Sequence, residues 1–191
     1  MKRILLTSHG INTKLGYDKI ARAMVLEDNS DKKILLITDP VDEIQNLLRA
    51  RAEQLGFAKK NIWVLEAANV NEVKNIAFDV IYVSEGNTFS ILAYMKKLDI
   101  LDHIRQCAMN GADYIGASAG AHIAGQIISA SYELEEGADQ LTDYTALGLL
   151  DGIVLPHFRL ERYSLYKKLR ESGEYKEIYL VSDDGILEAC I

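Results

Sequence analysis

Ser118 lies between two glycines in the stretch YIGASAGAHIAG, residues 114–125, where an apolar run meets a helix start rich in small residues. In this context the pattern G-x-S-x-G is typical of a nucleophilic serine on a sharp turn between a strand and a helix. Such a serine needs small neighbours, because its strained backbone brings other parts of the chain close. The N–H of Ala119, at the start of the helix, would then point to where an oxyanion forms. The alternative interpretation is that Gly and Ala only let a helix pack closely on a sheet, and the bare motif does not separate the two.

A nucleophilic serine requires a base, and the chain has four histidines. His157 ends the strand-like run GIVLPHF, and the carboxyl ends of parallel strands share one edge of a sheet. We therefore expect His157 to meet Ser118 at that edge and to act as the base. His122 follows the serine by one helical turn and could line the same pocket, and His9 and His103 complete the set. Taken alone, a histidine at a strand end is more often a surface or capping residue.

A second donor for an oxyanion would come from another strand end, and the run VSEGNTF, residues 83–89, offers one. Gly86 can bring its backbone close to a ligand, and Asn87 can start the next helix. The structural alternative is a Gly-Asn turn that caps a helix, which explains the same residues without any ligand.

The elements that must position these residues alternate along the chain. Short runs rich in Ile, Leu and Val, typical of strands covered on both faces, are followed by amphipathic stretches. Five such strand-then-helix units predict an α/β fold with a doubly wound, mostly parallel sheet and helices on both faces. The expected strands are residues 3–8, 33–39, 61–67, 79–86 and 113–118, and the expected helices are 14–28, 40–56, 69–78, 87–110 and 119–130.

The composition is that of an ordinary globular protein, with 49% hydrophobic and 26% charged residues. Nothing resembles a linker, so one domain over residues 1–191 is expected. The formal net charge of -7 argues against a nucleic-acid-binding protein, and no window of about 18 apolar residues suggests a membrane span or export. The two cysteines, Cys107 and Cys190, lack the spacing of a disulfide framework or a zinc site, which favours a cytoplasmic location.

Three motifs together, EGNTF (85–89), YIGASAGAHIAG (114–125) and LPHF (155–158), resemble the peptidase E family of serine peptidases, the aspartyl dipeptidases. The family pattern reads approximately G-G-N-T-F, then G-x-S-A-G-A, then P-H-F, and the resemblance covers nearly the whole chain. It implies a flavodoxin-like sheet related to class I glutamine amidotransferases, with serine in place of their cysteine. No metal or organic cofactor is expected, since the serine supplies the nucleophile and the sequence shows no cluster of metal ligands.

The resemblance also implies a role for each matching residue. Ser118 would be the nucleophile, His157 the general base, and the N–H groups of Gly86 and Ala119 the oxyanion hole. Family members carry a carboxylate about 15 residues after the serine, which here is Glu133. The acid stays open among nearby carboxylates, because a loop difference of one or two residues would move the assignment to Glu135, Glu136 or Asp139.

The family removes N-terminal aspartate from small peptides, which implies a basic residue for the aspartate side chain. The segment HFRLERYSLYKKLR, residues 157–170, supplies Arg162 as the first candidate and Arg159 as the second. The alternative for these arginines is a solvated basic helix face. Asn87 and His122 are expected beside the substrate. Glu85 replaces the first glycine of the family pattern and would repel an acidic substrate if its side chain faced the site.

The expected partner is a small peptide, with no nucleic acid and no membrane, and the protein could be a monomer or a homodimer. Two rival functions remain at this point. A catalytically silent, amidotransferase-like ligand-binding protein would keep the serine turn without turnover, and Glu85 is an argument for it. An α/β-hydrolase-type esterase shares G-x-S-x-G, but it should carry an H-G-G-G-type loop that this sequence lacks.

Overall fold

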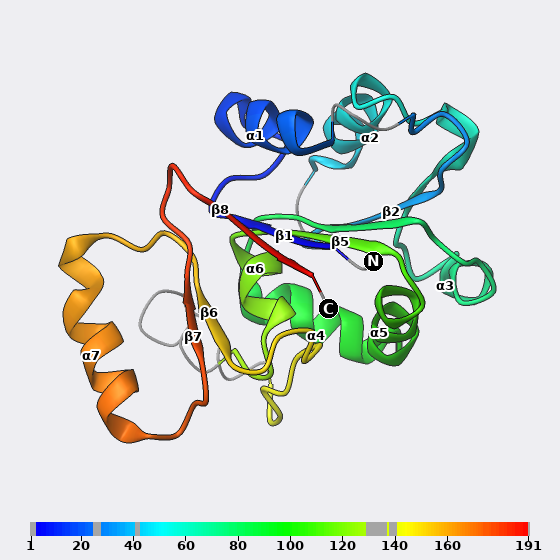
Figure 1. Ribbon diagram of the computed structural model, residues 1–191. Coiled ribbons are helices and arrows are strands. Elements are labelled where there is room, and N and C mark those ends of the chain that lie inside the picture. The colour runs from blue at the N-terminus through cyan, green and yellow to red at the C-terminus, as the bar shows by residue number, and fades with distance from the viewer. Residues whose placement is uncertain (1–2, 25–27, 41–42, 129–136, 138–140, 191) are drawn as a thin grey trace.

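A six-stranded sheet forms the centre of the computed structural model (Figure 1). The structure describes residues 3–24, 28–40, 43–128, 137 and 141–190. Along the sheet the strand order is β3-β2-β4-β5-β1-β8, and all neighbouring pairs are parallel except β8 with β1. The mostly parallel α/β sheet predicted from the sequence is thereby confirmed. The strands are β1 (Arg3–Thr7), β2 (Ile34–Ile37), β3 (Ile62–Val64), β4 (Val80–Val83), β5 (Asp113–Ala117) and β8 (Ile186–Cys190).

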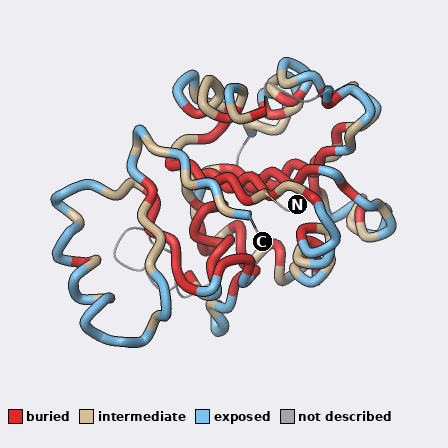
Figure 2. The backbone as a smooth tube through the Cα atoms, viewed as in Figure 1, coloured by how far each residue is buried: buried red, intermediate tan, exposed pale blue. Residues whose placement is uncertain are grey.

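Helices cover both faces of this sheet (Figure 1). Helices α1 (Lys14–Met24) and α2 (Gln45–Gln54) lie on one face, and the opposite face carries the short α3 (Val70–Val73), α4 (Thr88–Lys97), α5 (Leu101–Met109) and α6 (Ala119–Ala124). A 3-10 turn, η1 (Lys59–Asn61), precedes β3. Successive strand residues point to opposite faces, so Leu5 packs with the α1 and α2 side while Ile4 and Leu6 pack with the α4 to α6 side. Figure 2 shows the resulting band of buried residues along the sheet.

The chain after α6 forms a smaller unit beside the main sheet. Strand β6 (Ile153–Leu155) pairs in parallel with β7 (Ile178–Leu180) in a separate two-stranded sheet, and the 3-10 turn η4 (Leu160–Arg162) and helix α7 (Tyr163–Ser172) connect them. Helix α7 projects outward and is largely exposed (Figures 1 and 2). Of its ten residues only Leu165 is buried.

The position of β6 differs from the expectation that His157 ends a strand of the main sheet. The edge beside β1 is occupied by β8, which pairs with it antiparallel over five residues from Arg3 to Thr7. The strand before His157 therefore lies outside the six-stranded sheet. Strand β8 itself is an edge strand, with exposed residues alternating with half-buried ones. Within the described ranges, no helix has the length and apolar character needed to cross a membrane.

Candidate active site

Ser118 occupies the turn between β5 and α6 in a backbone conformation that is rare for residues other than glycine. Its φ is 47° and its ψ is -101°. This conformation is strained and persists only where the surrounding structure enforces it. The Ser118 N–H donates to the Thr7 carbonyl at 2.8 Å, which ties the turn to the end of β1. The serine is thus held at the carboxyl edge of the sheet.

The glycines on either side of Ser118 allow this turn to form. A Cβ at Gly116 would lie 2.5 Å from the Gly120 carbonyl oxygen, and one at Gly120 would lie 2.2 Å from the Val83 carbonyl oxygen. Both distances are too short for any side chain. Close packing of the helix on the sheet therefore explains the two glycines without any catalytic role. It does not explain the strained φ of Ser118.

His157 lies directly against the serine. Its Nε2 is 2.9 Å from Ser118 Oγ. His157 also has a positive φ, 54°, and its backbone N–H donates to Ser8 Oγ at 2.8 Å. Ser8 is buried after β1, and its hydroxyl lies 3.1 Å from the Val181 carbonyl oxygen. Ser8 thus connects the backbone of His157 to the segments that follow β1 and β7. These hydrogen bonds position His157 beside the main sheet, although β6 is not part of that sheet.

A carboxylate that sequence reasoning missed holds the other ring nitrogen of His157. Asp183 Oδ1 lies 2.7 Å from His157 Nδ1, and Asp183 Oδ2 accepts from Arg159 Nε at 2.6 Å. Burial acts to raise the pKa of the Asp183 carboxyl, but hydrogen bonds from Arg159 and His157 outweigh it, so the pKa lies below its ordinary value. Asp183 is ionised at neutral pH and suited to stabilise a charged imidazole.

A signal for Asp183 is present in the sequence. The run EIYLVSDDG places it just after a strand-like stretch, in the turn that precedes the final strand. The predicted acid, Glu133, lies outside the described residues, and so do the alternatives Glu135, Glu136 and Asp139.

The two predicted oxyanion donors are Gly86, in the loop after β4, and Ala119, the first residue of α6. The Gly120 N–H donates to the Ser84 carbonyl at 3.2 Å, which joins the start of α6 to the loop after β4. Gly86, in that loop, has a φ of 143°, which only glycine readily adopts. Across the described ranges, the N–H groups of Gly86 and Ala119 have no hydrogen-bond acceptor. Both groups can therefore donate to a ligand oxygen.

Glu85 and Asn87, which flank Gly86, both have structural partners. Glu85 Oε2 accepts from the Gly10 N–H at 2.9 Å, and Oε1 accepts from the Asn12 side-chain amide. The Glu85 carboxylate thus ties the loop after β1 to the loop after β4. Asn87 Oδ1 caps α4 by accepting a hydrogen bond from the Ser90 N–H at 2.9 Å. This is the helix-capping role that the sequence offered as the alternative to ligand binding.

The remaining predicted residues surround His157 in different ways. Arg162 Nη1 donates to the carbonyls of Pro156 and His157, the latter at 3.1 Å, so η4 packs against the histidine backbone. Arg159 is bound to Asp183. His122 is 2% exposed in α6, and burial together with the positive charge of Arg162 lowers its pKa to about 3. His122 is therefore a neutral, enclosed side chain and not a residue lining an open pocket.

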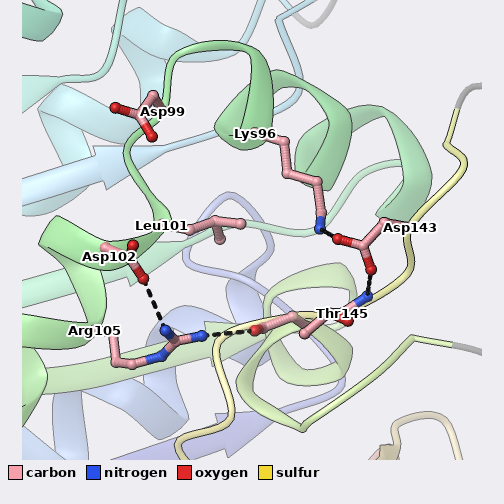
Figure 3. Close-up of a pocket in the computed structure, with 8 residues that line it drawn as sticks. Lys96, Asp99, Leu101, Asp102, Arg105, Asp143 and Thr145 are labelled. Carbon is pink, nitrogen blue, oxygen red and sulfur yellow. Dashed lines mark hydrogen bonds and ion pairs between the residues drawn. The ribbon is translucent and has the colours of Figure 1, made fainter.

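Two cavities lie away from these residues. One of about 270 Å³ is found between α4, α5 and the segment 143–146 (Figure 3). In it Lys96 contacts Asp143 at 2.6 Å and Arg105 contacts Asp102 at 2.8 Å, so both basic side chains of the cavity are paired with acidic ones. The other, of about 250 Å³, lies around Phe78 and Cys107. None of the predicted site residues lines either cavity.

Comparison with known proteins gives a consistent match. The chain matches the model of peptidase family S51 over residues 4–190. Peptidase E of Actinobacillus pleuropneumoniae is 38% identical over 111 residues, which are 58% of this chain and 47% of that protein. An uncharacterized peptidase of Listeria innocua is 42% identical over 82 residues, which are 42% of this chain and 39% of that protein. The matches thus span less than half of the length of these curated relatives.

Solved structures share the fold. A crystal structure from Listeria monocytogenes that carries the peptidase E name has a TM-score of 0.71 at 24% identity, and the match covers 100% of this chain and 99% of that one. The structure of a peptidase from an acI-B1 actinobacterium has a TM-score of 0.64 at 15% identity and covers 99% of this chain and 83% of that one. At these identities the likeness shows a common α/β architecture.

Proposed function

The chain belongs to peptidase family S51, and on that premise we propose that it is a serine exopeptidase that hydrolyses dipeptides or short peptides with an N-terminal aspartate. The observation that carries the proposal is the 2.9 Å contact between Ser118 Oγ and His157 Nε2 at a serine with a strained backbone. A hydroxyl is a poor nucleophile until a base accepts its proton, and this contact supplies one.

The reaction proceeds through an acyl-enzyme. His157 Nε2 accepts the Ser118 proton as Oγ attacks the carbonyl carbon of the N-terminal residue. The carbonyl oxygen gains its negative charge between the N–H groups of Gly86 and Ala119, whose capacity to donate supports this role. His157 then returns the proton to the leaving amine, and a water molecule attacks the acyl-enzyme by the same route.

We assign the third position to Asp183 in place of Glu133. A carboxylate on Nδ1 keeps the proton on that nitrogen, so that Nε2 presents its lone pair to the serine, and it stabilises the imidazolium that forms. The 2.7 Å contact of Asp183 with His157 Nδ1 meets both requirements. The proposed triad is therefore Ser118, His157 and Asp183.

The preference for N-terminal aspartate is proposed from positive charge near the histidine. Arg162 packs on the His157 carbonyl, and a guanidinium can bind a carboxylate through two parallel hydrogen bonds. Arg159 is committed to Asp183 and supports the triad instead. Glu85 is bound to Gly10 and Asn12, which lessens its repulsion of an acidic substrate.

The test is hydrolysis of Asp-Leu beside Glu-Leu, Ala-Leu and N-acetyl-Asp-Leu, with wild type and Ser118→Ala. Cleavage of Asp-Leu alone, lost in the variant, is the expected result. Failure to cleave N-acetyl-Asp-Leu would show that a free amino group is required. If none of the four is cleaved, a fluorophosphonate probe decides the matter: labelling of Ser118 means a different substrate, and no labelling means a silent binding protein.

A further inference from the structure

We propose that His9, His157 and Asp183 form an inhibitory site for a Zn²⁺-type divalent cation. They are the one group of three metal-ligating side chains found in the described part of the chain, with ligand atoms within 4.8 Å of one another. They come from three separate segments: the loop after β1, the residue pair after β6, and the turn between β7 and β8. The inhibitory effect rests on the proposed function, whereas the binding of the ion does not.

The geometry suits a small tetrahedral ion. His9 Nε2 lies 3.6 Å from Asp183 Oδ1, and His157 Nδ1 lies 2.7 Å from the same oxygen. Ligand atoms on tetrahedral zinc lie roughly 3.3 Å apart, since Zn–N and Zn–O bonds are about 2.0–2.1 Å long. An ion that replaced the hydrogen between His157 and Asp183 would require these two atoms to separate from 2.7 Å by about 0.6 Å. Two imidazoles and a carboxylate are a donor set that zinc accepts, with a fourth position left for water.

The surroundings allow the ion to enter. The side chains of His9, His157 and Asp183 are 29%, 36% and 18% exposed, so each ligand is reachable from solvent. The His9 ring meets the His157 ring edge to face, with centroids 5.3 Å apart, which holds the two imidazoles in place. The positive charge of Arg159 opposes the binding of a cation at Asp183. Arg159 binds Asp183 Oδ2, not Oδ1, and its side chain is 67% exposed, so water can solvate the guanidinium if it leaves the carboxylate.

Binding would inhibit through the tautomer of His157. In the resting site, the Asp183 carboxylate can only accept a hydrogen bond, which favours the ring proton on Nδ1 and leaves the lone pair of Nε2 facing Ser118. A cation on Nδ1 displaces that proton, and the neutral ring then carries its single proton on Nε2. That nitrogen can donate to Ser118 Oγ but cannot accept its proton. The serine consequently loses its base, with no covalent change to the protein.

His103 and Cys107 offer a rival location for the same ion. Cys107 Sγ lies 3.6 Å from His103 Nε2, four residues apart on α5. Burial raises the pKa of the Cys107 thiol, which disfavours the thiolate that zinc prefers. The test must nevertheless separate the two locations, and the variant Cys107→Ser does so because it leaves the Ser118 region untouched.

The experiment compares wild type, His9→Phe and Cys107→Ser. The phenylalanine keeps an aromatic ring beside His157 and removes the ligand nitrogen. Zn²⁺ binding is measured by isothermal titration calorimetry, and its effect by Asp-Leu hydrolysis and by fluorophosphonate labelling of Ser118. We expect one ion per chain, loss of both turnover and labelling that EDTA reverses, and a half-inhibitory Zn²⁺ concentration at least about 10-fold higher in His9→Phe. Cys107→Ser should behave as wild type, and both variants should keep turnover without zinc.

The outcomes separate the two proposals. An active wild type that neither binds nor responds to Zn²⁺ overturns the metal site and leaves the peptidase assignment intact. Unchanged zinc sensitivity in His9→Phe, or its loss in Cys107→Ser, also overturns the site. Should no peptide be hydrolysed, calorimetric binding that His9→Phe abolishes would still support the metal site, and the peptidase assignment alone would fall.

Discussion

Asp183 lies 2.7 Å from Nδ1 of His157, although 26 residues separate the two along the chain. Helix α7 and strand β7 lie between them, and the turn into β8 brings the carboxylate back to the imidazole. This contact is the basis for proposing Asp183, and not Glu133, as the acid that pairs with His157.

The identity of the acid can be tested by two isosteric substitutions. Asp183→Asn should lower kcat for Asp-Leu by about 100-fold or more, because an amide no longer favours the tautomer with the Nδ1 proton. Glu133→Gln should leave kcat within a few-fold of wild type. The measurement is steady-state kinetics with folding checked by circular dichroism. The reverse ranking of the two variants would return the assignment to Glu133.

The strained backbone of Ser118 should cost stability. Ser118→Gly should raise the free energy of unfolding by about 1 kcal/mol or more, because glycine adopts a φ of 47° without a Cβ penalty. Ser118→Ala keeps the Cβ and should give no such gain, while both variants lose turnover. Urea denaturation of the three proteins measures the difference. Equal stability of the Gly and Ala variants would mean that the turn is not strained.

The buried His122 should make the protein sensitive to acid. Its pKa is about 3 in the folded protein, where burial and Arg162 disfavour the charged ring, and near 6.5 in the unfolded chain. Between these values the unfolded chain binds more protons, so the free energy of unfolding falls as pH falls from about 6.5 to about 3, by on the order of a few kcal/mol.

The check for His122 is the Tm of wild type and His122→Gln across that pH range. The glutamine cannot gain a proton, so the variant should lose less Tm on acidification than wild type. His103→Gln serves as the control, because His103 is only half-buried and should contribute less. Parallel Tm curves for wild type and His122→Gln would contradict the assignment.

Arg162 should determine the preference for an acidic first residue. Arg162→Gln should lower kcat/KM for Asp-Leu by about 10- to 100-fold, since a hydrogen bond to a charged group contributes about 1.5–3 kcal/mol. Its effect on Ala-Leu should be much smaller. Arg170, exposed on α7, provides the matched control Arg170→Gln, which should change neither value. Equal losses on both peptides would assign Arg162 to support of the His157 backbone alone.

The sequence by itself determined the mostly parallel α/β sheet and the turn that carries Ser118. Both depend on local order: hydrophobic runs of strand length, amphipathic helices between them, and small residues within two positions of the serine. The glycines at 116 and 120 are required by contacts that the strand-turn-helix geometry creates wherever it forms. The pairing of His157 with Ser118 was also predicted, although the reason offered for it, a shared sheet edge, was wrong, because β6 lies in the separate two-stranded sheet.

Only the tertiary structure decided which carboxylate meets His157 and which side chains are enclosed. Asp183 reaches the imidazole because β8 pairs antiparallel with β1 and the turn before it folds over the carboxyl edge of the sheet. The direction of a final strand and its partner depend on which sheet edge is left open, and that is a property of the whole fold. For the same reason the burial of His122 and the binding of Arg159 to Asp183 could not be predicted from sequence spacing.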